Sequence, residues 1–137
     1  MRLLLDTRIP PWAVADDERL LPRARGLARA RGLVSDQATD VFVNAASVWE
    51  IAIKHALARS DPNDMPVSGA DALGYFLDAG YETIGTSPAD AAAVETLPML
   101  YADPFDRLLI AQAVTVPFCL LTHDARIARY SPSIILV

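Results

Sequence analysis

The sequence is poor in the residue types that build disulfide-bonded, zinc-binding or membrane-spanning proteins. Its 137 residues include one cysteine, Cys119, so no disulfide can form, and we expect a buried, inert thiol in a reducing compartment. The two histidines, His55 and His123, have no ligand partner at helical spacing, which disfavours a zinc site. The longest uncharged stretch, 108–122, is broken by Pro117 and is too short to span a membrane.

An excess of basic charge is also missing. The net charge is −5, which argues against a protein that coats nucleic acid through its overall charge. It leaves open an enzyme that reaches phosphates through metal ions held by carboxylates. The apolar run after Arg2 ends at Asp6, so no signal peptide is expected. We therefore expect one soluble, cytoplasmic domain over residues 1–137, with no membrane association.

Short apolar stretches alternate with helical segments along the chain. Continuous apolar strands are typical of parallel sheets that are covered on both faces. We therefore expect an α/β fold with a parallel central sheet of four to five strands and helices on both faces. The predicted strands are 2–6, 40–44, 81–85, 118–122 and 134–137. The predicted helices are 16–32, 48–58, 70–79, 87–97 and 103–113.

The 16–32 segment holds five of the twelve basic residues, namely Arg19, Arg23, Arg25, Arg29 and Arg31. They form either a solvated helix face or a strip that contacts phosphates, and the sequence favours the solvated face.

Three helix starts place an acid three residues after a capping residue, at 47–50, 87–90 and 103–106. In the last of these, Pro104 takes the first helical position, where its missing N–H group costs nothing. Capping alone explains each of these acids in local terms. A functional role requires that the acids meet in space.

Four acids occupy connections between strands and helices. Asp6 and Asp124 follow two predicted strands, and Glu50 and Asp106 lie in the first turns of two predicted helices. Because parallel strands end at one edge of a sheet, the four carboxylates can share that edge, although a turn or cap role for Asp6 stays open. Clustered carboxylates are costly unless a cation such as Mg²⁺ or Mn²⁺ joins them. Such a site suits metal-assisted hydrolysis of a phosphodiester.

Four stretches of the chain resemble, in order and spacing, the PIN-domain ribonucleases, specifically the VapC toxins of type II toxin–antitoxin systems. They are LLLDT at 3–7, ASVWEIAIK at 46–54, DPFDRLLIAQA at 103–113 and LTHD at 121–124. The resemblance runs across essentially the whole chain. The second and third stretches are long enough to be specific, whereas LLLDT alone would be a weak signal.

The resemblance implies a PIN-like fold and a Mg²⁺- or Mn²⁺-dependent endoribonuclease. It also implies inhibition by a small VapB-type antitoxin and assembly as a homodimer. The metal-binding and catalytic acids of the family map onto Asp6, Glu50, Asp106 and Asp124. We expect a basic segment of the antitoxin to lie near these acids, because an arginine there would pair with them in place of metal.

Three further residues of the same motifs are candidates for supporting roles: Asp103, Thr122 and Thr7. The chain departs from related sequences at Arg8 and Tyr101, where histidine is usual, and at 10–11, where two prolines replace apolar helix residues. These departures affect the shape of the first crossover and of the rim of the site. They therefore bear on which RNA the site accepts.

Two other functions are compatible with acids at strand ends. One is a metal-dependent phosphatase, which is disfavoured because the residue two after Asp6 is Arg8 and because no Gly-rich phosphate loop is present. The other is a catalytically inactive PIN-like binding module, which would not need the carboxylates to converge.

Overall fold

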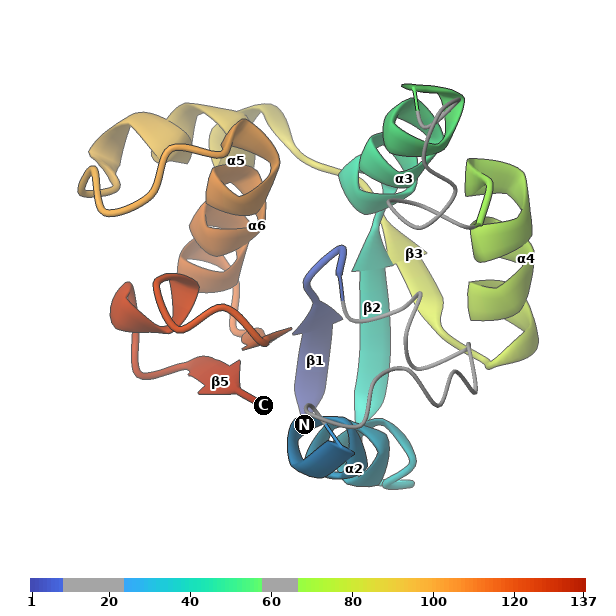
Figure 1. Ribbon diagram of the computed structural model, residues 1–137. Helices are drawn as coiled ribbons and strands as arrows, with labels where there is room; N and C mark the ends of the chain where they lie inside the picture. Colours follow the sequence, from blue (N-terminus) through green and yellow to red (C-terminus); the bar gives the residue numbers. More distant parts are fainter. Residues whose placement is uncertain (9–23, 58–66) are drawn as a thin grey trace.

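The computed structural model describes residues 1–8, 24–57 and 67–137, with side chains in the second range placed from residue 29 onward. Five parallel strands form one sheet in the order β3-β2-β1-β4-β5 (Figure 1). The strands are β1 (Arg2–Leu5), β2 (Asp40–Asn44), β3 (Glu82–Ile84), β4 (Cys119–Thr122) and β5 (Ile134–Leu136). All five predicted strands are confirmed, and so is the parallel sheet.

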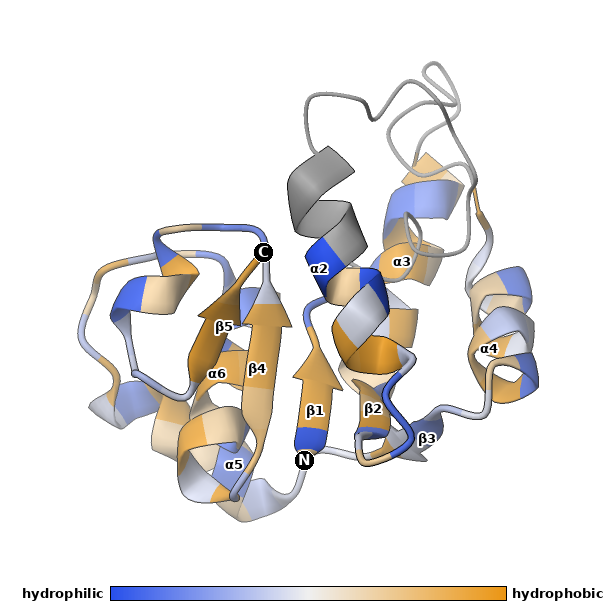
Figure 2. Ribbon diagram, turned by 90° about the horizontal axis from the view of Figure 1, so that it is seen from below, coloured by the Kyte–Doolittle hydropathy of each residue, from blue (hydrophilic) through white to orange (hydrophobic). Residues whose placement is uncertain are grey.

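Helices cover both faces of this sheet, as predicted (Figures 1 and 2). The helices are α2 (Ala24–Val34), α3 (Ala45–Leu57), α4 (Gly69–Asp78), α5 (Pro88–Ala93) and α6 (Pro104–Thr115). Two short 3-10 helices follow α5 and β4, namely η2 (Val94–Thr96) and η3 (Ile127–Arg129). The first part of the helix predicted over 16–32, with Arg19 and Arg23, lies outside the described residues, as does the pair of prolines at 10–11.

The alternation of side chains along β1 divides the core into two layers. Leu3 and Leu5 pack with residues of α2, α3 and α4, whereas Leu4 packs with residues of α6 and η3 on the opposite face. All three leucines are fully buried. Burial of a leucine side chain contributes about 1.5–3 kcal/mol. The continuous apolar run at the start of the chain is therefore explained by a strand that is covered on both sides.

Helix α3 begins at Ala45, three residues before the predicted start. The predicted capping box of Ser47 and Glu50 is wrong, because Ser47 lies inside the helix. The side-chain oxygen of Asn44 instead accepts a hydrogen bond from the backbone N–H of Ala46, at 2.7 Å. An asparagine at the end of β2 thus satisfies an N–H group at the start of the helix.

Two other helix starts confirm the predicted capping. Ser87 and Asp90 form a reciprocal capping box at α5, and Asp103 caps α6 ahead of Pro104. The helix predicted over 70–79 is confirmed as α4, and Gly80, which has a φ of 78°, follows its end.

Two predictions of extent or burial are wrong. The helix predicted over 87–97 ends at Ala93 and gives way to η2. Cys119, expected to be buried, is only half-buried at the start of β4.

The strand order reverses next to β1. The chain passes from β1 to β2 and β3 on one side, and then crosses to β4 and β5 on the other side. In open α/β sheets, ligands bind beyond the carboxyl ends of the strands at such a reversal. Asp6 and the residues after Thr122 occupy this place. Among the described residues, no helix is long and apolar enough to cross a membrane.

Candidate active site

Asp6 stands at the strand reversal and is held from β4. Its backbone N–H donates to the carbonyl of Leu121 at 3.0 Å, and its Oδ2 accepts a hydrogen bond from the Thr122 hydroxyl at 2.7 Å. Both side chains are buried. One oxygen of the Asp6 carboxylate is therefore oriented by the neighbouring strand.

The end of β1 is also joined to α3. The Thr7 hydroxyl donates to the Ser47 hydroxyl at 3.1 Å, and both residues are buried. Ser47 precedes Glu50 by nearly one helical turn. The hydroxyl pair thus holds the first turn of α3 against the strand end that carries Asp6, which places Glu50 at the same edge.

Glu50 and Asp106 come from helices on opposite faces of the sheet. The residues that precede them, Trp49 and Phe105, are in edge-to-face contact with ring centroids 5.2 Å apart. One oxygen of Glu50, Oε1, is paired with the ammonium group of Lys54. The Asp103 carboxylate accepts from the backbone N–H groups of Phe105 and Asp106 at 2.9 and 3.2 Å, so Asp103 serves as the cap of α6.

Three of the predicted acids are brought together and share one property. Asp6, Glu50 and Asp106 are each at most 2 % exposed. Each has one oxygen (Asp6 Oδ1, Glu50 Oε2 and Asp106 Oδ2) that is buried without a hydrogen-bond partner among the described residues. Buried polar atoms are nearly always satisfied in folded proteins. Three unsatisfied carboxylate oxygens at one edge therefore indicate that a binding partner belongs there.

The electrostatics show that the three carboxylates influence one another. Burial, together with the carboxylates of Asp6, Asp103 and Glu50, raises the pKa of Asp106 to about 7. Burial also raises the pKa of Asp6, with a smaller contribution from Glu50, while the Thr122 hydroxyl acts in the opposite direction. The site thus concentrates negative charge that the protein only partly compensates.

The donor set fits a hard divalent cation, since Mg²⁺ and Mn²⁺ prefer carboxylate oxygens. In the described part of the chain, however, no three His, Cys, Asp or Glu side chains are arranged closely enough to hold a metal ion. Carboxylates without a counter-ion repel one another. We therefore expect the three carboxylates to move within coordination distance of the metal ion only when the ion binds.

The fourth predicted acid, Asp124, is in a different state. It lies in the turn after β4, and its carboxylate forms an ion pair with Arg126 at 2.6 Å. Hydrogen bonds from Arg126 hold the pKa of Asp124 at about 2. The structure thus gathers three of the four acids and pairs the fourth, so the role of Asp124 as a metal ligand stays a prediction.

Arg8 and Tyr101, which the sequence associates with the rim of the site, lie near the Asp106 carboxylate. Burial, followed by the nearby Asp106 carboxylate, raises the pKa of Tyr101, and Arg8 acts in the opposite direction. Local sequence does not distinguish Arg107 from the rest of its helix, yet this residue is buried and fixes the loop that carries Tyr101.

Gln112 links α6 to the sheet behind the site. Its Oε1 accepts from the Asn44 amide at 2.7 Å, and its Nε2 donates to the Gly85 carbonyl at 2.9 Å and to the Asp90 carboxylate at 3.2 Å. Thr115 also donates to Asp90, at 3.0 Å. This buried network sets the position of α6, and hence of Asp106, relative to β2.

Comparisons with known proteins bear on the fold. No protein-family model and no curated protein matches the sequence. Among solved structures, the chain is similar to one in the crystal structure of VapBC2 from Rickettsia felis bound to a DNA fragment from their promoter. That match has a TM-score of 0.66 and 17% identity, and covers 100% of this chain and 98% of the other.

A second similar structure is FitAcB from Neisseria gonorrhoeae, with a TM-score of 0.59 and 18% identity over 98% of this chain and 96% of the other. The chain has a PIN-like fold. The fold class expected from the resemblance is thereby confirmed. The PIN-like fold places Asp6, Glu50 and Asp106 at one edge of the sheet, and the chemistry of that edge is the basis for the function proposed below.

Proposed function

We propose that this PIN-like chain is the toxin component of a type II toxin–antitoxin system. Its activity would be that of a VapC-like, Mg²⁺- or Mn²⁺-dependent endoribonuclease, which hydrolyses phosphodiester bonds of RNA. The observation that carries the proposal is the set of three buried, unsatisfied carboxylate oxygens of Asp6, Glu50 and Asp106. The origin of both structural neighbours in toxin–antitoxin complexes supports the biological role.

Asp6, Glu50 and Asp106 would hold the cation. When bound, a divalent ion lowers the pKa of a coordinated water and stabilises charge on a phosphate. The chain's own residues prepare the site for it. Thr122 orients Asp6 so that Oδ1 remains available, and Lys54 occupies only one oxygen of Glu50. The network of Gln112 keeps α6, and with it Asp106, in place.

The proposed partners are RNA as substrate, a VapB-type antitoxin as inhibitor and a second copy of the chain in a homodimer, all in the cytoplasm. An arginine of the antitoxin would satisfy the same carboxylates as the metal. We therefore expect the complex with the antitoxin to cleave RNA more slowly than the free chain. Equal rates for the complex and the free chain would contradict this mode of inhibition.

The test of the proposed activity is a cleavage assay with short single-stranded RNAs in Mg²⁺, in Mn²⁺ and in EDTA. The wild type should cleave only with metal, and Asp6→Asn and Asp106→Asn should each lower the rate by about 100-fold or more. Asp78→Asn, which changes an exposed aspartate at the end of α4, is the matched control and should cleave like the wild type.

Two results would contradict the nuclease. Cleavage that persists in EDTA or in both acid variants would remove the metal and the carboxylates from the reaction. If the wild type neither cleaved RNA nor bound Mn²⁺ in calorimetry, the chain would act as a binding module. Hydrolysis of a phosphomonoester without cleavage of RNA would instead indicate a phosphatase.

A further inference from the structure

The Asp124 carboxylate differs from the three other acids because both of its oxygens are occupied. The Arg126 guanidinium donates from Nε to Oδ1 at 3.0 Å and from Nη2 to Oδ2 at 2.6 Å. Oδ1 also accepts from the backbone N–H of Arg126 at 2.9 Å. This two-point contact aligns the planes of the two groups and fixes the direction of the arginine side chain.

Arg126 remains open to solvent in spite of this ion pair, with its side chain 59% exposed. Its guanidinium lies over the ring of Tyr101, 4.4 Å from the centroid. Asp124 takes the edge formed by Nε and Nη2, which leaves the two N–H groups of Nη1. Among the described residues, none accepts a hydrogen bond from Nη1, so this part of the fork is available to an anion.

A second arginine approaches the same tyrosine. Burial acts to lower the pKa of Arg8, but the nearby Asp106, Tyr101 and Asp6 outweigh burial and raise it. The tyrosine itself is held firmly, because its backbone carbonyl accepts from Arg107 at 3.2 Å. Arg8, Tyr101 and Arg126 thus form a cationic border beside the carboxylates, which we call the arginine rim.

We propose that the arginine rim binds the phosphate backbone of RNA, and that Asp124 is a positioning residue for Arg126 and does not bind metal. This inference rests on the proposed function and assigns its substrate contacts. A polyanion that approaches three carboxylates needs cations next to them, and the chain has a net charge of −5. A guanidinium held along one edge by a carboxylate presents its other donors in the fixed geometry that suits a phosphate.

Two binding measurements separate this role from that of a metal ligand. The first titrates Mn²⁺ into the protein by calorimetry, and the second follows a fluorescein-labelled single-stranded RNA by anisotropy in EDTA. The variants are Asp124→Asn, Arg126→Ala, the double variant and, for comparison, Asp6→Asn. Asparagine keeps the oxygen that accepts from the backbone of Arg126, so the turn should be preserved.

The expected results differ between the two measurements. Asp124→Asn should change the affinity for Mn²⁺ by no more than about twofold, whereas Asp6→Asn should weaken it by about tenfold or more. Asp124→Asn and Arg126→Ala should each weaken RNA binding by about 5- to 10-fold. The double variant should bind RNA no more weakly than the weaker single variant, because both changes remove one contact.

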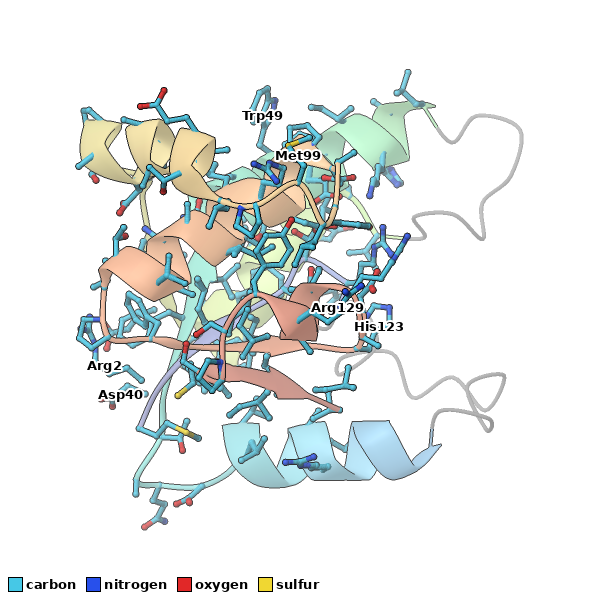
Figure 3. All side chains as sticks on the ribbon, turned by 90° about the vertical axis from the view of Figure 1, so that its left-hand side faces the viewer. Arg2, Asp40, Trp49, Met99, His123 and Arg129 are labelled. Carbon is cyan, nitrogen blue, oxygen red and sulfur yellow. The ribbon has the colours of Figure 1, made fainter. Side chains whose placement is uncertain are left out.

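Arg2→Met provides the charge-matched control. Arg2 lies at the amino end of β1, at the opposite end of the sheet from His123 and Arg129, which flank the segment of Arg126 (Figure 3). Methionine keeps an apolar stem against Phe42 and Phe118, over which Arg2 is stacked. This variant should bind RNA within about twofold of the wild type if the effect of Arg126 is local.

The inference is overturned if Asp124→Asn weakens Mn²⁺ binding as much as Asp6→Asn does, or if Arg126→Ala leaves RNA affinity unchanged. Neither result would affect the proposed nuclease if the wild type binds Mn²⁺ and cleaves RNA. Failure of the wild type in both of those assays would instead remove the proposed function itself.

Discussion

The indole of Trp49 meets the phenyl ring of Phe105 edge-on, and in each case the next residue is a buried carboxylate of the site. Trp49 belongs to α3 and Phe105 to α6, which cover opposite faces of the sheet. The aromatic pair therefore joins the two layers at the edge where Glu50 and Asp106 emerge, and it couples the positions of these acids.

A double-mutant cycle measures that coupling. Aromatic pairs of this geometry contribute about 0.5–1.5 kcal/mol beyond the area they bury. We expect the double variant, Trp49→Ala with Phe105→Ala, to be destabilised by less than the sum of the two single variants. The difference, which is the coupling energy, should be about 0.5–1.5 kcal/mol. Urea unfolding of the four proteins gives the free energies of unfolding. A coupling energy below about 0.3 kcal/mol would show that the rings are independent.

Arg107 should be among the most sensitive positions of α6. Its guanidinium is 8% exposed and donates to the backbone carbonyls of Val94, Leu97, Pro98 and Tyr101 at 3.1–3.2 Å. Arg107→Met should lower the free energy of unfolding by about 2–4 kcal/mol, because it leaves several carbonyls without donors. Arg107→Lys should not restore stability, since a lysine lacks the planar fork.

The control for Arg107 is Arg129→Met, which changes an exposed arginine of η3 and should alter stability by less than about 0.5 kcal/mol. Urea unfolding monitored by circular dichroism provides the comparison. Full stability of either Arg107 variant would mean that the segment between α5 and α6 is held by other contacts.

Asp106→Asn should stabilise the metal-free protein while it removes the proposed activity. The substitution removes a buried carboxylate that lies near two others and keeps a polar group of the same shape. We expect the free energy of unfolding in EDTA to rise by about 1 kcal/mol. Added Mn²⁺ should raise the Tm of the wild type and not that of the variant.

Asp103→Asn is the matched control for Asp106→Asn, because asparagine caps a helix about as well as aspartate does. Its stability in EDTA should stay near that of the wild type, and Mn²⁺ should still raise its Tm. An Asp106→Asn variant less stable than the wild type in EDTA would contradict the view that this carboxylate is held at a cost in stability.

Asp90 should contribute stability that depends on pH. Hydrogen bonds, first from the backbone of Ser87 and then from side chains that include Thr115, lower the pKa of Asp90. A carboxyl with a lowered pKa in the folded state stabilises the protein above its unfolded pKa of about 3.9. That contribution is lost as the pH falls through the folded-state pKa.

We therefore expect Asp90→Asn to lower the free energy of unfolding by about 1 kcal/mol at pH 7. This difference from the wild type should become smaller as the pH falls below about 4. Unfolding curves at several pH values measure it, with Glu82→Gln, an exposed residue of β3, as the control. A difference that does not change between pH 7 and pH 3 would contradict the assignment.

Much of the fold could be predicted because its signals are local. The run Leu3 to Leu5 is apolar on successive residues, which only a strand buried on both faces requires. Pro104 after Asp103 marks the start of α6, and Gly80 marks the end of α4. In these segments, local preference and tertiary structure agree.

The parts that escaped prediction depend on contacts between distant residues. Ser47 has the spacing of a helix cap, yet Asn44 lies at the end of β2 and takes that role, while Ser47 pairs with Thr7. Asp124 follows a strand as Asp6 does, but a neighbouring arginine occupies its carboxylate. Neither outcome can be read from the pattern of a single segment. Each depends on which side chain lies within hydrogen-bond distance of the helix N–H group or of the carboxylate in the folded protein.

The most direct measurement is a crystal structure of the protein soaked in Mn²⁺, with anomalous diffraction to locate the metal. We predict a strong anomalous peak at the carboxyl edge of the sheet, with Asp6 Oδ1 and Asp106 Oδ2 at about 2.1 Å from the ion and Glu50 directed at it. No peak near these oxygens, at a Mn²⁺ concentration that supports RNA cleavage, would contradict the claim that the three unsatisfied carboxylates form the metal site.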